Sequence, residues 1–495
     1  MSHRQGGWPD EIDPQEVADV TRYMKKMNRD ATLGFAQASV EMTKRAEDCM
    51  LENNQIDLFE EYFAGEQPEH LSETITTKTM MIFKDPSVFK RAATSINWHP
   101  DTTEQRVGVT YAMLRFQQMP HDMPRESYIW NLNNPNFPEK TLAAPSPLCT
   151  MAFNPKNSNI VVGGSYNGSL SFFDLSVGNA SGVIRPVKTT FLEKSHHDPV
   201  YDVQWSTVGK SGSECFSVST DGRVLWWDMK DPEGIPREMK ILEDQVPVTT
   251  ADGRTELKTK ILGGTSLEYN SEVGPLKYLI GTEQGYIQQL NKKKSIEINM
   301  RYGYDQVLCQ DIGKHHGPVY SLWRNPDHPK YFLSVGDWSA KIWSEEQKSP
   351  IMQTRYHQAY LTDGCWSKSR AGLFFLTRID GFLDVWDFYY RQNEVAYSQK
   401  ISDSPLTSIE VNHDMAAIGD AEGTVSIMKL CKPLYERAPN EKEIMQQIFE
   451  REFRRERTLE ISKKKEADKK GPPKKDPKVV EREKAEADAK MTDDL

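Results

Sequence analysis

The sequence predicts an all-β fold, a propeller of seven blades, with helices before it and a charged helical or disordered tail after it. Three observations predict this fold. In six places a turn-forming residue stands six positions before a bulky apolar residue, and glycine directly follows the turn residue in five of them. Three of the apolar residues are followed by aspartate. The copies recur at intervals typical of a repeated structural unit.

The copy at 221–228 shows most completely why the unit is built from strands. The pair Asp221-Gly222 lies between two β-rich runs, 215–219 and 224–227. Glycine accepts a positive φ and aspartate tolerates it, so the pair favours a tight hairpin between antiparallel strands.

The apolar anchors of successive copies are separated by 43, 54, 63, 53, 43 and 42 residues. The shortest intervals approach the WD40 period of about 40 to 45 residues, and we interpret the longer ones as that period plus loop insertions. One small sheet cannot bury both of its faces, so the units must stack around an axis as a WD40 propeller. The seven anchors are Trp130, Phe173, Trp227, Leu290, Trp343, Trp386 and Met428.

Two helices are predicted in an N-terminal segment at 1–70, which precedes the propeller at 71–434 and a C-terminal segment at 435–495. Apolar residues recur at helical spacing from 15 to 27, and a second helix is expected from about 32 to 63. The pair either packs on the side of the propeller or docks a partner, because short helices need a surface to cover. The candidate contact residues are Val17, Val20, Met24, Met27, Phe35, Ile56 and Phe59.

The ring is expected to close through a strand that precedes the first blade. Residues 74–83 are rich in Thr, Ile and Met, a composition typical of a strand, and we expect them to complete the last blade. The first blade is placed at 96–130 and the other six from 148 to about 430. Insertions at 231–260 and 291–312 are expected to project from the ring, where partner contacts concentrate.

The C-terminal segment divides into a helix and a polar tail. Residues 443–461 carry Ile, Phe and Leu loosely on one side of a charged helix, whereas 463–495 are rich in Lys, Glu and Asp. The tail lacks the apolar surface that would offset the entropy lost on ordering. We expect it to be disordered in isolation, with a charge-rich helix docked on a partner as the alternative.

Composition argues against several classes of protein. The formal net charge is −10, whereas a general nucleic-acid binder presents a strongly basic face. No apolar run is long enough to span a membrane, and no apolar secretory region opens the sequence. The six cysteines stand singly, which predicts reduced thiols. We therefore expect an intracellular protein with no membrane or nucleic-acid partner.

No residues combine into a predicted catalytic, cofactor or metal site. The histidine pairs 196–197 and 315–316 lack the Cys or carboxylate ligands that would accompany them at a metal. We interpret the second histidine of each pair as buried in its blade and the first as solvent-facing. The turn aspartates are interpreted as structural acceptors, so no enzyme is predicted. The predicted structural blade residues are His197, Asp221, Trp227, His316, Asp337, Trp343, Asp380 and Trp386.

Three tryptophans of the ring, Trp98, Trp338 and Trp366, are candidates for partner contacts. Tryptophan is enriched in binding hot spots because it offers a large amphipathic surface. Trp338 stands where other copies of the repeat have glycine. The alternative interpretation of each is a tryptophan packed inside its blade.

Five stretches are long and specific enough to point to a family. They are KRAATSINWHP at 90–100, SYIWN at 127–131, STDGRVLWWD at 219–228, GTEQG at 281–285 and VGDWSAKIWS at 335–344. In these stretches the chain resembles the axonemal dynein intermediate chains, above all the intermediate chain 2 type of the outer arm. The likeness runs from about residue 7, through NQIDLFEEYF at 54–63, to FEREFRR at 449–455.

The resemblance implies a non-catalytic subunit of a ciliary motor, assembled in the cytoplasm and placed in the axoneme of a cilium or flagellum. In that family the propeller holds the tail of a dynein heavy chain and pairs with a second WD-repeat intermediate chain, and the N-terminal region carries dynein light chains. The microtubule would be reached indirectly. The N-terminus is expected to be shorter than the family's. No Thr-Gln-Thr light-chain anchor is present, and 77–79 is interpreted as strand.

A propeller that reads short peptides is the rival hypothesis, for example a ubiquitin-ligase adaptor or a histone-tail reader. It predicts a compact monomer that binds peptides on one face of the ring. The assembly hypothesis predicts obligate partners instead.

Overall fold

The computed structural model describes residues 11–29, 35–55, 75–101, 104–113, 120, 122–177, 182–207, 212–231, 234–249, 255–270, 277–291, 306–307 and 313–470. The chain divides into two compact units, one ending at Pro68 and one beginning at Glu69. Two helices belong to the first unit and all of the strands to the second.

Helices α1 (Val17–Arg29) and α2 (Phe35–Gln55) belong to the first unit. The predicted apolar stripe falls on α1, where spacings of three and four residues place side chains on one face. The helix expected at 32–63 is confirmed over the range of α2. Ile56 and Phe59 lie outside the described residues.

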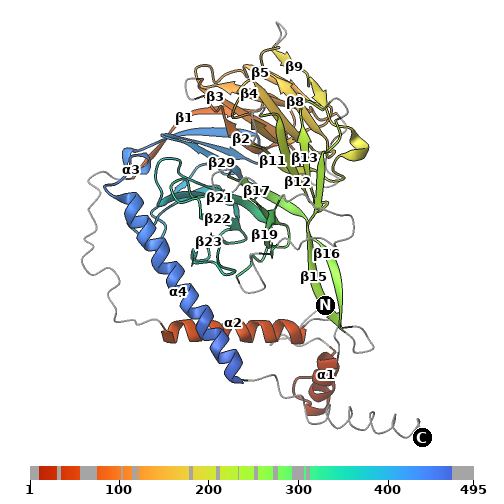
Figure 1. The fold of residues 1–495 in the computed structure, drawn as a ribbon, viewed down its shortest axis with the longest axis vertical. Coiled ribbons are helices and arrows are strands. Elements are labelled where there is room, and N and C mark those ends of the chain that lie inside the picture. Colours follow the sequence, from red (N-terminus) through yellow and green to blue (C-terminus); the bar gives the residue numbers. More distant parts are fainter. Residues whose placement is uncertain are drawn as a thin grey trace. The chain divides into compact units, whose positions relative to one another are not determined.

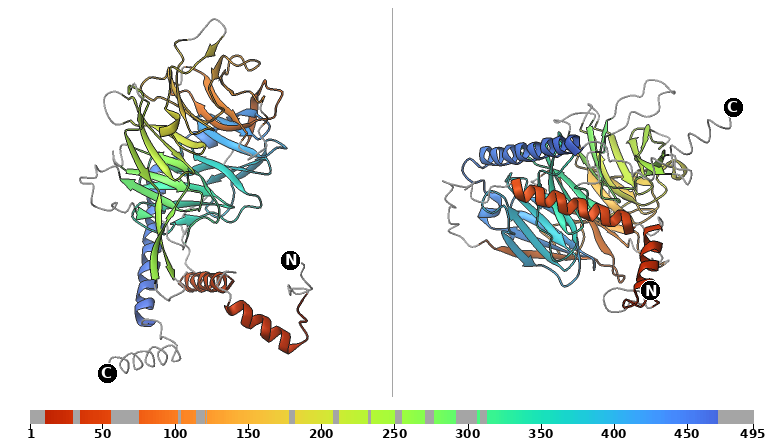
Figure 2. Two further views of the ribbon diagram at one scale, coloured as in Figure 1. Left: turned by 90° about the vertical axis from the view of Figure 1, so that its right-hand side faces the viewer. Right: turned by 90° about the horizontal axis from the view of Figure 1, so that it is seen from below.

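The second unit is a seven-bladed propeller, as predicted (Figures 1 and 2). Each blade is an antiparallel sheet, and its first strand lies against the first strands of the neighbouring blades, so these strands form the inside of the ring. Short β9 (Val183–Ile184) extends blade 1 in parallel with β5, and a single 3-10 turn spans Leu192–Lys194.

The blades are formed from the following strands. Blade 1 has β2 (Ala92–Trp98), β3 (Arg106–Ala112), β4 (Glu126–Asn131) and β5 (Lys140–Ala143). Blade 2 has β6 (Leu148–Phe153), β7 (Ile160–Ser165), β8 (Leu170–Asp174) and β10 (Lys188–Thr189). Blade 3 has β11 (Val200–Trp205), β12 (Glu214–Ser219), β13 (Arg223–Asp228) and β14 (Glu238–Ile241). Blade 4 has β17 (Gly264–Tyr269), β18 (Lys277–Thr282), β19 (Ile287–Asn291) and β20 (Gln306–Val307). Blade 5 has β21 (Val319–Arg324), β22 (Tyr331–Gly336), β23 (Ser339–Ser344) and β24 (Met352–Gln353). Blade 6 has β25 (Leu361–Trp366), β26 (Leu373–Arg378), β27 (Phe382–Asp387) and β28 (Tyr397–Lys400). Blade 7 has β29 (Leu406–Asn412), β30 (Met415–Asp420), β31 (Thr424–Leu430) and β1 (Thr77–Lys84).

The ring closes through β1, as the sequence predicts. β1 pairs antiparallel with β31 from Thr77↔Leu430 to Lys84↔Thr424, so the first strand of the propeller completes the last blade. Phe83 of β1 is buried and stacks on Trp130 of blade 1, with ring centroids 5.0 Å apart. Closure is therefore secured by a hydrogen-bonded ladder and by packing across the joint.

The hairpin turns inside the blades follow the predicted pattern, with one exception. Gly222 has a φ of 77° in the turn between β12 and β13, a conformation that glycine adopts without strain. The turn of blade 5 is one residue shorter and consists of Asp337 and Trp338, between β22 and β23. There Asp337 has the positive φ, 50°, and Trp338 projects at the tip of the turn.

Neighbouring blades are joined at their inner strands. Every inner strand has a register shift near its start, which withdraws residues from its own ladder. Side chains at these points reach the next blade: Thr265 Oγ1 donates to the Val319 carbonyl at 2.6 Å, and Ser321 Oγ donates to the Gly364 carbonyl at 2.6 Å. Buried apolar side chains fill the space between blades.

The insertion between blades 3 and 4 forms a separate hairpin of β15 (Glu243–Thr249) and β16 (Thr255–Ile261). It extends away from the ring, as expected, but it begins later than residue 231 because β14 completes blade 3 (Figures 1 and 2). Most of the other insertion, 291–312, lies outside the described residues.

Two helices follow blade 7. α3 (Lys432–Tyr435) is a single turn, and α4 (Glu441–Lys470) is a long charged helix that begins against the ring (Figure 1). The predicted helix at 443–461 is therefore confirmed. The tail after 470 lies outside the described residues.

Candidate partner-binding site

Blades 3 and 5 each contain a buried network of histidine, serine, aspartate and tryptophan. In blade 5, Ser334 Oγ lies 2.7 Å from His315 Nε2 and accepts a hydrogen bond from Trp343 Nε1 at 2.8 Å. His315 Nδ1 lies 3.4 Å from the carboxylate of Asp337. This geometry suits a neutral imidazole that accepts the serine proton and carries its own proton on Nδ1. The network fixes the turn of the blade to its core.

Blade 3 repeats this arrangement with other residues. Ser217 Oγ lies 2.8 Å from His196 Nε2 and accepts from Trp227 Nε1 at 2.8 Å, and His196 Nδ1 lies 3.3 Å from Asp221. The predicted roles of Asp221, Trp227, Asp337 and Trp343 are thus consistent with their contacts.

The prediction for the histidines was wrong by one residue. His196 and His315 are the buried members of the pairs, whereas the side chains of His197 and His316 are exposed. The backbone N–H groups of His197 and His316 donate to the turn aspartates at 3.1 and 2.9 Å. Each aspartate therefore holds one histidine by its ring and the next by its backbone, which leaves the second ring outside.

Blade 6 keeps the tryptophan but arranges its carboxylates differently, which corrects the prediction for Asp380. Asp380 is exposed and pairs with Arg378. The buried acceptor is Asp384, which lies 2.9 Å from His357 Nδ1 and accepts from Ser398 Oγ at 2.6 Å. The ring of His357 packs edge-on against Trp386 at 5.7 Å.

The electrostatics of blade 5 show a structural carboxylate rather than a general base. Burial opposes the charge of Asp337, but the His315 ring, 3.4 Å away, and hydrogen bonds from the His316 backbone and Ser339 outweigh it and hold the pKa of the carboxyl well below its ordinary range. Burial lowers the pKa of His315. A general base needs a pKa closer to neutrality and access to a substrate, and Asp337 is fully buried.

Two inner-strand aspartates link neighbouring blades. Asp202 Oδ2 accepts from the Leu267 N–H of blade 4 at 2.8 Å, and Asp363 Oδ2 accepts from the Ile409 N–H of blade 7 at 2.9 Å. Burial raises the pKa of each to about 7, although the backbone donors oppose the shift. In the described ranges, no three His, Cys, Asp or Glu side chains form a group suited to a metal ion.

The three candidate tryptophans differ in exposure. Trp98 and Trp366 are buried, and their Nε1 atoms donate to the carbonyls of Glu410 and Trp323 in neighbouring blades at 3.0 and 3.1 Å. They are packed blade tryptophans, so the partner-contact prediction for them was wrong. Trp338 is 44% exposed and packs edge-on against Tyr360, with ring centroids 5.2 Å apart. It remains a candidate contact residue.

The C-terminal helix packs on blades 5 and 6, a contact that sequence analysis missed. Three apolar side chains of the helix are buried in the core cluster of these blades: Met445, Ile448 and Phe449. They stand at positions i, i+3 and i+4, which lie on one face of a helix. The Phe449 ring lies 4.7 Å from that of Tyr331. The sequence predicted an apolar side on this helix but did not indicate that this side packs on the ring.

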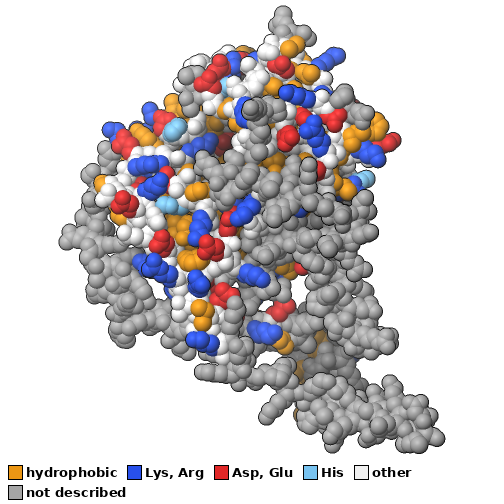
Figure 3. All heavy atoms as spheres, in the orientation of Figure 1, with side chains coloured by type: hydrophobic (Ala, Val, Ile, Leu, Met, Phe, Trp, Pro, Cys, Tyr) orange, Lys and Arg blue, Asp and Glu red, His pale blue; other side chains and the backbone are white. Residues whose placement is uncertain are grey.

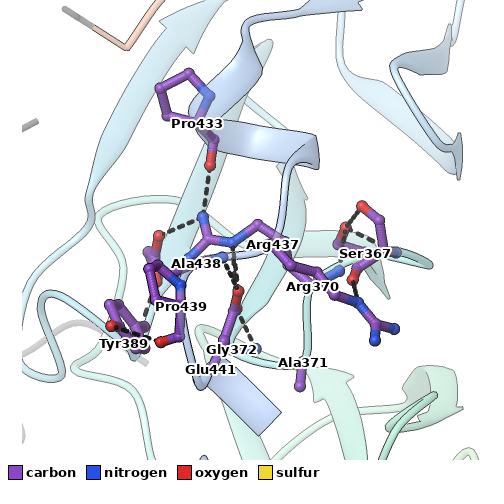
Figure 4. A network of polar contacts seen from close by, with 12 residues as sticks. Ser367, Arg370, Ala371, Gly372, Tyr389, Pro433, Arg437, Ala438, Pro439 and Glu441 are labelled. Atoms are coloured by element: carbon purple, nitrogen blue, oxygen red, sulfur yellow. Dashed lines mark hydrogen bonds and ion pairs between the residues drawn. The ribbon is translucent and has the colours of Figure 1, made fainter. Parts of the chain in front are cut away.

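A buried ion network fixes the start of α4 (Figure 4). Arg370 Nε donates to both carboxylate oxygens of Glu441 at 3.1 and 3.0 Å, and Arg370 Nη1 donates to Asp387 at 2.8 Å and to the Pro433 carbonyl at 2.6 Å. Glu441, the first residue of α4, also accepts from the N–H of Ala438, which precedes the helix. Burial opposes the charge of Arg370, but the two carboxylates raise its pKa.

The candidate residues of the first unit are partly exposed. Val17 is 79% and Met24 53% exposed, and Val20 and Met27 are half-buried. Phe35 begins α2, and its side chain lies outside the described part of the structure. α1 therefore presents apolar side chains that the unit itself leaves uncovered.

The surface of the described residues is mixed in charge. Figure 3 shows Lys and Arg side chains interspersed with Asp and Glu over one face, with apolar side chains in small groups between them. Among the helices of the described part of the chain, none is both long enough and apolar enough to cross a membrane.

Comparison with known proteins gives this ring a family. Residues 256–430 match the family described as the dynein axonemal intermediate chain 3 WD40 domain. The chain is 41% identical over 464 residues to the 70 kDa intermediate chain of the flagellar outer arm dynein of Chlamydomonas reinhardtii, an alignment that covers 93% of this chain and 77% of the relative. The chain belongs to the axonemal dynein intermediate chains. Human dynein axonemal intermediate chain 2 is likewise 41% identical, with 93% of this intermediate chain and 72% of the human protein covered.

A more distant member shows how far the likeness extends. The ciliary dynein intermediate chain 2 of Heliocidaris crassispina is 26% identical over 359 residues, which cover 71% of this intermediate chain and 48% of that relative. The 41% identity thus places this intermediate chain nearer to the outer-arm intermediate chain 2 type than to that relative.

Proposed function

We propose that this chain is a non-catalytic assembly subunit of outer-arm axonemal dynein in a cilium or flagellum. The observation that carries the proposal is the 41% identity over 93% of the chain to an outer-arm intermediate chain. The polar networks of blades 3 and 5 support it, because their side chains bond to one another within the blade, as structural groups do. ATP hydrolysis then belongs to another subunit, and no cofactor is required here.

The proposed partners are the tail of a dynein heavy chain, a second WD-repeat intermediate chain and dynein light chains, with the microtubule of the axoneme reached through them. A rigid ring supports this role because it presents loops at fixed positions. The uncovered apolar residues of α1 support a docking role for this helix, because a helix of 13 residues is marginally stable alone and needs a surface to cover.

The test is purification of the tagged full-length chain from cilia at moderate salt, with mass spectrometry of the proteins that accompany it. We expect a dynein heavy chain and a second intermediate chain in stoichiometric amounts. A monomeric chain, or a ubiquitin-ligase or chromatin complex, would overturn the proposal.

The proposed role of α1 has its own pair of variants. Val17→Ala with Met24→Ala removes exposed apolar surface and keeps helix propensity, whereas Arg22→Ala with Lys25→Ala alters the same helix on its polar side. We expect only the first pair to reduce the recovery of partner chains. Equal recovery of partner chains with both pairs of substitutions would show that α1 is not part of the docking surface.

A further inference from the structure

Three aromatic side chains meet at one end of blades 5 and 6. The Tyr360 ring lies 5.2 Å from Trp338 and 5.9 Å from Tyr320, measured between centroids, and the interplanar angles are 82° and 79°. Trp338 is 44% and Tyr320 41% exposed. Two partly exposed rings thus pack edge-on around a third, and part of each exposed ring remains accessible to a ligand from solvent.

Backbone hydrogen bonds hold the segments that carry these rings in place. The His357 N–H donates to the Trp338 carbonyl at 2.8 Å, and the Leu361 N–H donates to the Asp337 carbonyl at 2.8 Å, so the loop that carries Tyr360 is tied to the turn that carries Trp338. A Cβ at Gly317 would lie 2.5 Å from the Tyr360 hydroxyl, so the absence of a side chain there makes room for the ring. The cluster is therefore formed before any ligand arrives, which lowers the entropy cost of binding.

The chemistry of the cluster favours a cation. Aromatic faces carry negative charge density and attract ammonium and guanidinium groups. The ionised carboxylate of Asp337 lies beneath the turn and adds to this potential. Elsewhere in the ring cations already lie over aromatic faces, as Lys314 does over Tyr286 at 4.7 Å. Within the described residues, no lysine or arginine lies over Tyr320, Trp338 or Tyr360.

We propose that Tyr320, Trp338 and Tyr360 form an aromatic cage that binds a lysine or arginine side chain presented by a partner protein. The surface beside the cage suits a side chain rather than a free ion. Ile379, whose N–H donates to the Tyr360 carbonyl, is 47% exposed and offers an apolar contact for the aliphatic stem. The inference goes beyond the assembly role, because it holds for any partner that presents such a residue.

The test uses the full-length chain and two fluorescein-labelled peptides, Gly-Ser-Lys-Ser-Gly and the same peptide with norleucine in place of lysine. Norleucine keeps the apolar stem and removes the charge. We expect fluorescence anisotropy to show the lysine peptide bound roughly tenfold more tightly than the norleucine peptide, and tetramethylammonium but not tert-butanol to compete. Equal binding of the two peptides would overturn the proposal.

Variants assign the binding to the cage. Trp338→Leu should reduce binding of the lysine peptide roughly tenfold, and Trp338→Phe should retain most of it, since only the second keeps an aromatic face. Phe137→Ala removes an exposed aromatic side chain elsewhere on the ring and should change nothing. Thermal unfolding of each variant shows whether it is folded. Unchanged binding in a folded Trp338→Leu protein overturns the proposal.

One further variant tests whether the cation comes from a partner protein or from this chain. The segment 471–495 of this chain is itself rich in lysine. Truncation after Lys470 should leave peptide binding unchanged if the cage serves a partner. Tighter binding of the lysine peptide after truncation would mean that the segment 471–495 competes for the cage. That result would overturn the assignment to a partner.

Discussion

Blades 5 and 6 stand side by side and carry the same buried pair of rings, His315 with Trp343 and His357 with Trp386, but they bond this pair differently. In blade 5, Ser334 bridges the histidine and the tryptophan. In blade 6 the corresponding residue is Leu376, and no hydrogen bond to Trp386 Nε1 is formed within the described residues.

The polar groups of blade 6 reach outside the blade instead. Arg370 binds Asp387 of its own blade and Glu441 of α4. Asp363 binds the backbone of blade 7, where blade 5 has the neutral Ser321 at the equivalent position. Two blades with the same repeat pattern can thus be stabilised in different ways. One relies on hydrogen bonds within the blade, and the other on contacts with the elements packed against it. The difference predicts that blade 6 is more sensitive to loss of its outward contacts.

The largest effect is expected for Arg370→Ala. The substitution leaves the carboxylates of Asp387 and Glu441 buried without their cation, and breaking a buried ion pair in this way costs about 4 kcal/mol. We expect the free energy of unfolding to fall by that amount in urea titration. Hydrogen exchange should rise first in α4, because Glu441 is the polar anchor of that helix.

The matched control is Arg437→Ala. Arg437 is half exposed and bonds to the Ser369 carbonyl and Asp327 near the same helix, so its loss should cost less than about 1 kcal/mol. If both variants lose the same stability, the buried network does not anchor α4 and the contrast between the blades fails.

The second effect concerns the carboxylate of blade 6. Asp384→Ala leaves His357, Ser398 and Arg378 without a shared buried acceptor, which should cost about 3 kcal/mol. Asp380→Ala, at the turn of the same blade, should cost less than about 1 kcal/mol because Asp380 is exposed. Thermal and urea unfolding of the two variants measure the difference. A larger loss of stability for Asp380→Ala than for Asp384→Ala would show that Asp380, not Asp384, is the structural carboxylate of blade 6.

The sequence was sufficient to predict the ring but not its internal connections. The anchors and turn glycines recur locally, within six residues, so the number of blades followed from the period, and closure through β1 followed from the strand-like composition of 74–83 before the first blade. The choice between His196 and His197 depends on a one-residue difference in register, which a period of about 40 residues does not resolve. Asp380 had the expected place in the turn, yet Arg378 holds it at the surface.

Contacts between distant residues gave no sequence signal. Arg370 and Glu441 are 71 positions apart, and each occurs in a polar stretch where a charged residue is ordinary. Trp98 and Trp366 were mistaken for contact residues because burial depends on the neighbouring blade, whose carbonyls accept from their Nε1 atoms. The apolar side of α4 was predicted from the sequence, but nothing in the sequence indicated that it packs on blades 5 and 6.

A smaller effect is expected for Ser334→Ala in blade 5. The variant removes the oxygen shared by His315 Nε2 and Trp343 Nε1 and leaves buried polar atoms unpaired, at a cost of about 2 kcal/mol. Ser217→Ala should cost a similar amount in blade 3, and the exposed Ser176→Ala almost nothing. Urea titration checks all three. A negligible loss for Ser334→Ala would mean that blade 5 is no more dependent on its bridge than blade 6, which has none.

The smallest effect separates the blades by pH. The pKa of Asp363 is raised from an ordinary value of 3.8 to about 7, so the folded chain retains a proton that the unfolded chain releases at lower pH. The stabilisation from this group is complete below the unfolded pKa and is lost as pH rises through about 7. Asp363 contributes at most about 1.4 kcal/mol per pH unit to the slope of the free energy of unfolding against pH. Asp363→Asn should therefore flatten the pH dependence of stability across this window, whereas Thr265→Ala, which removes the neutral contact from blade 4 to the Val319 carbonyl of blade 5, should lower stability without changing the slope. Urea titrations at several pH values measure both slopes, and an unchanged slope in Asp363→Asn would show that the two blades are joined to their neighbours by contacts of the same kind.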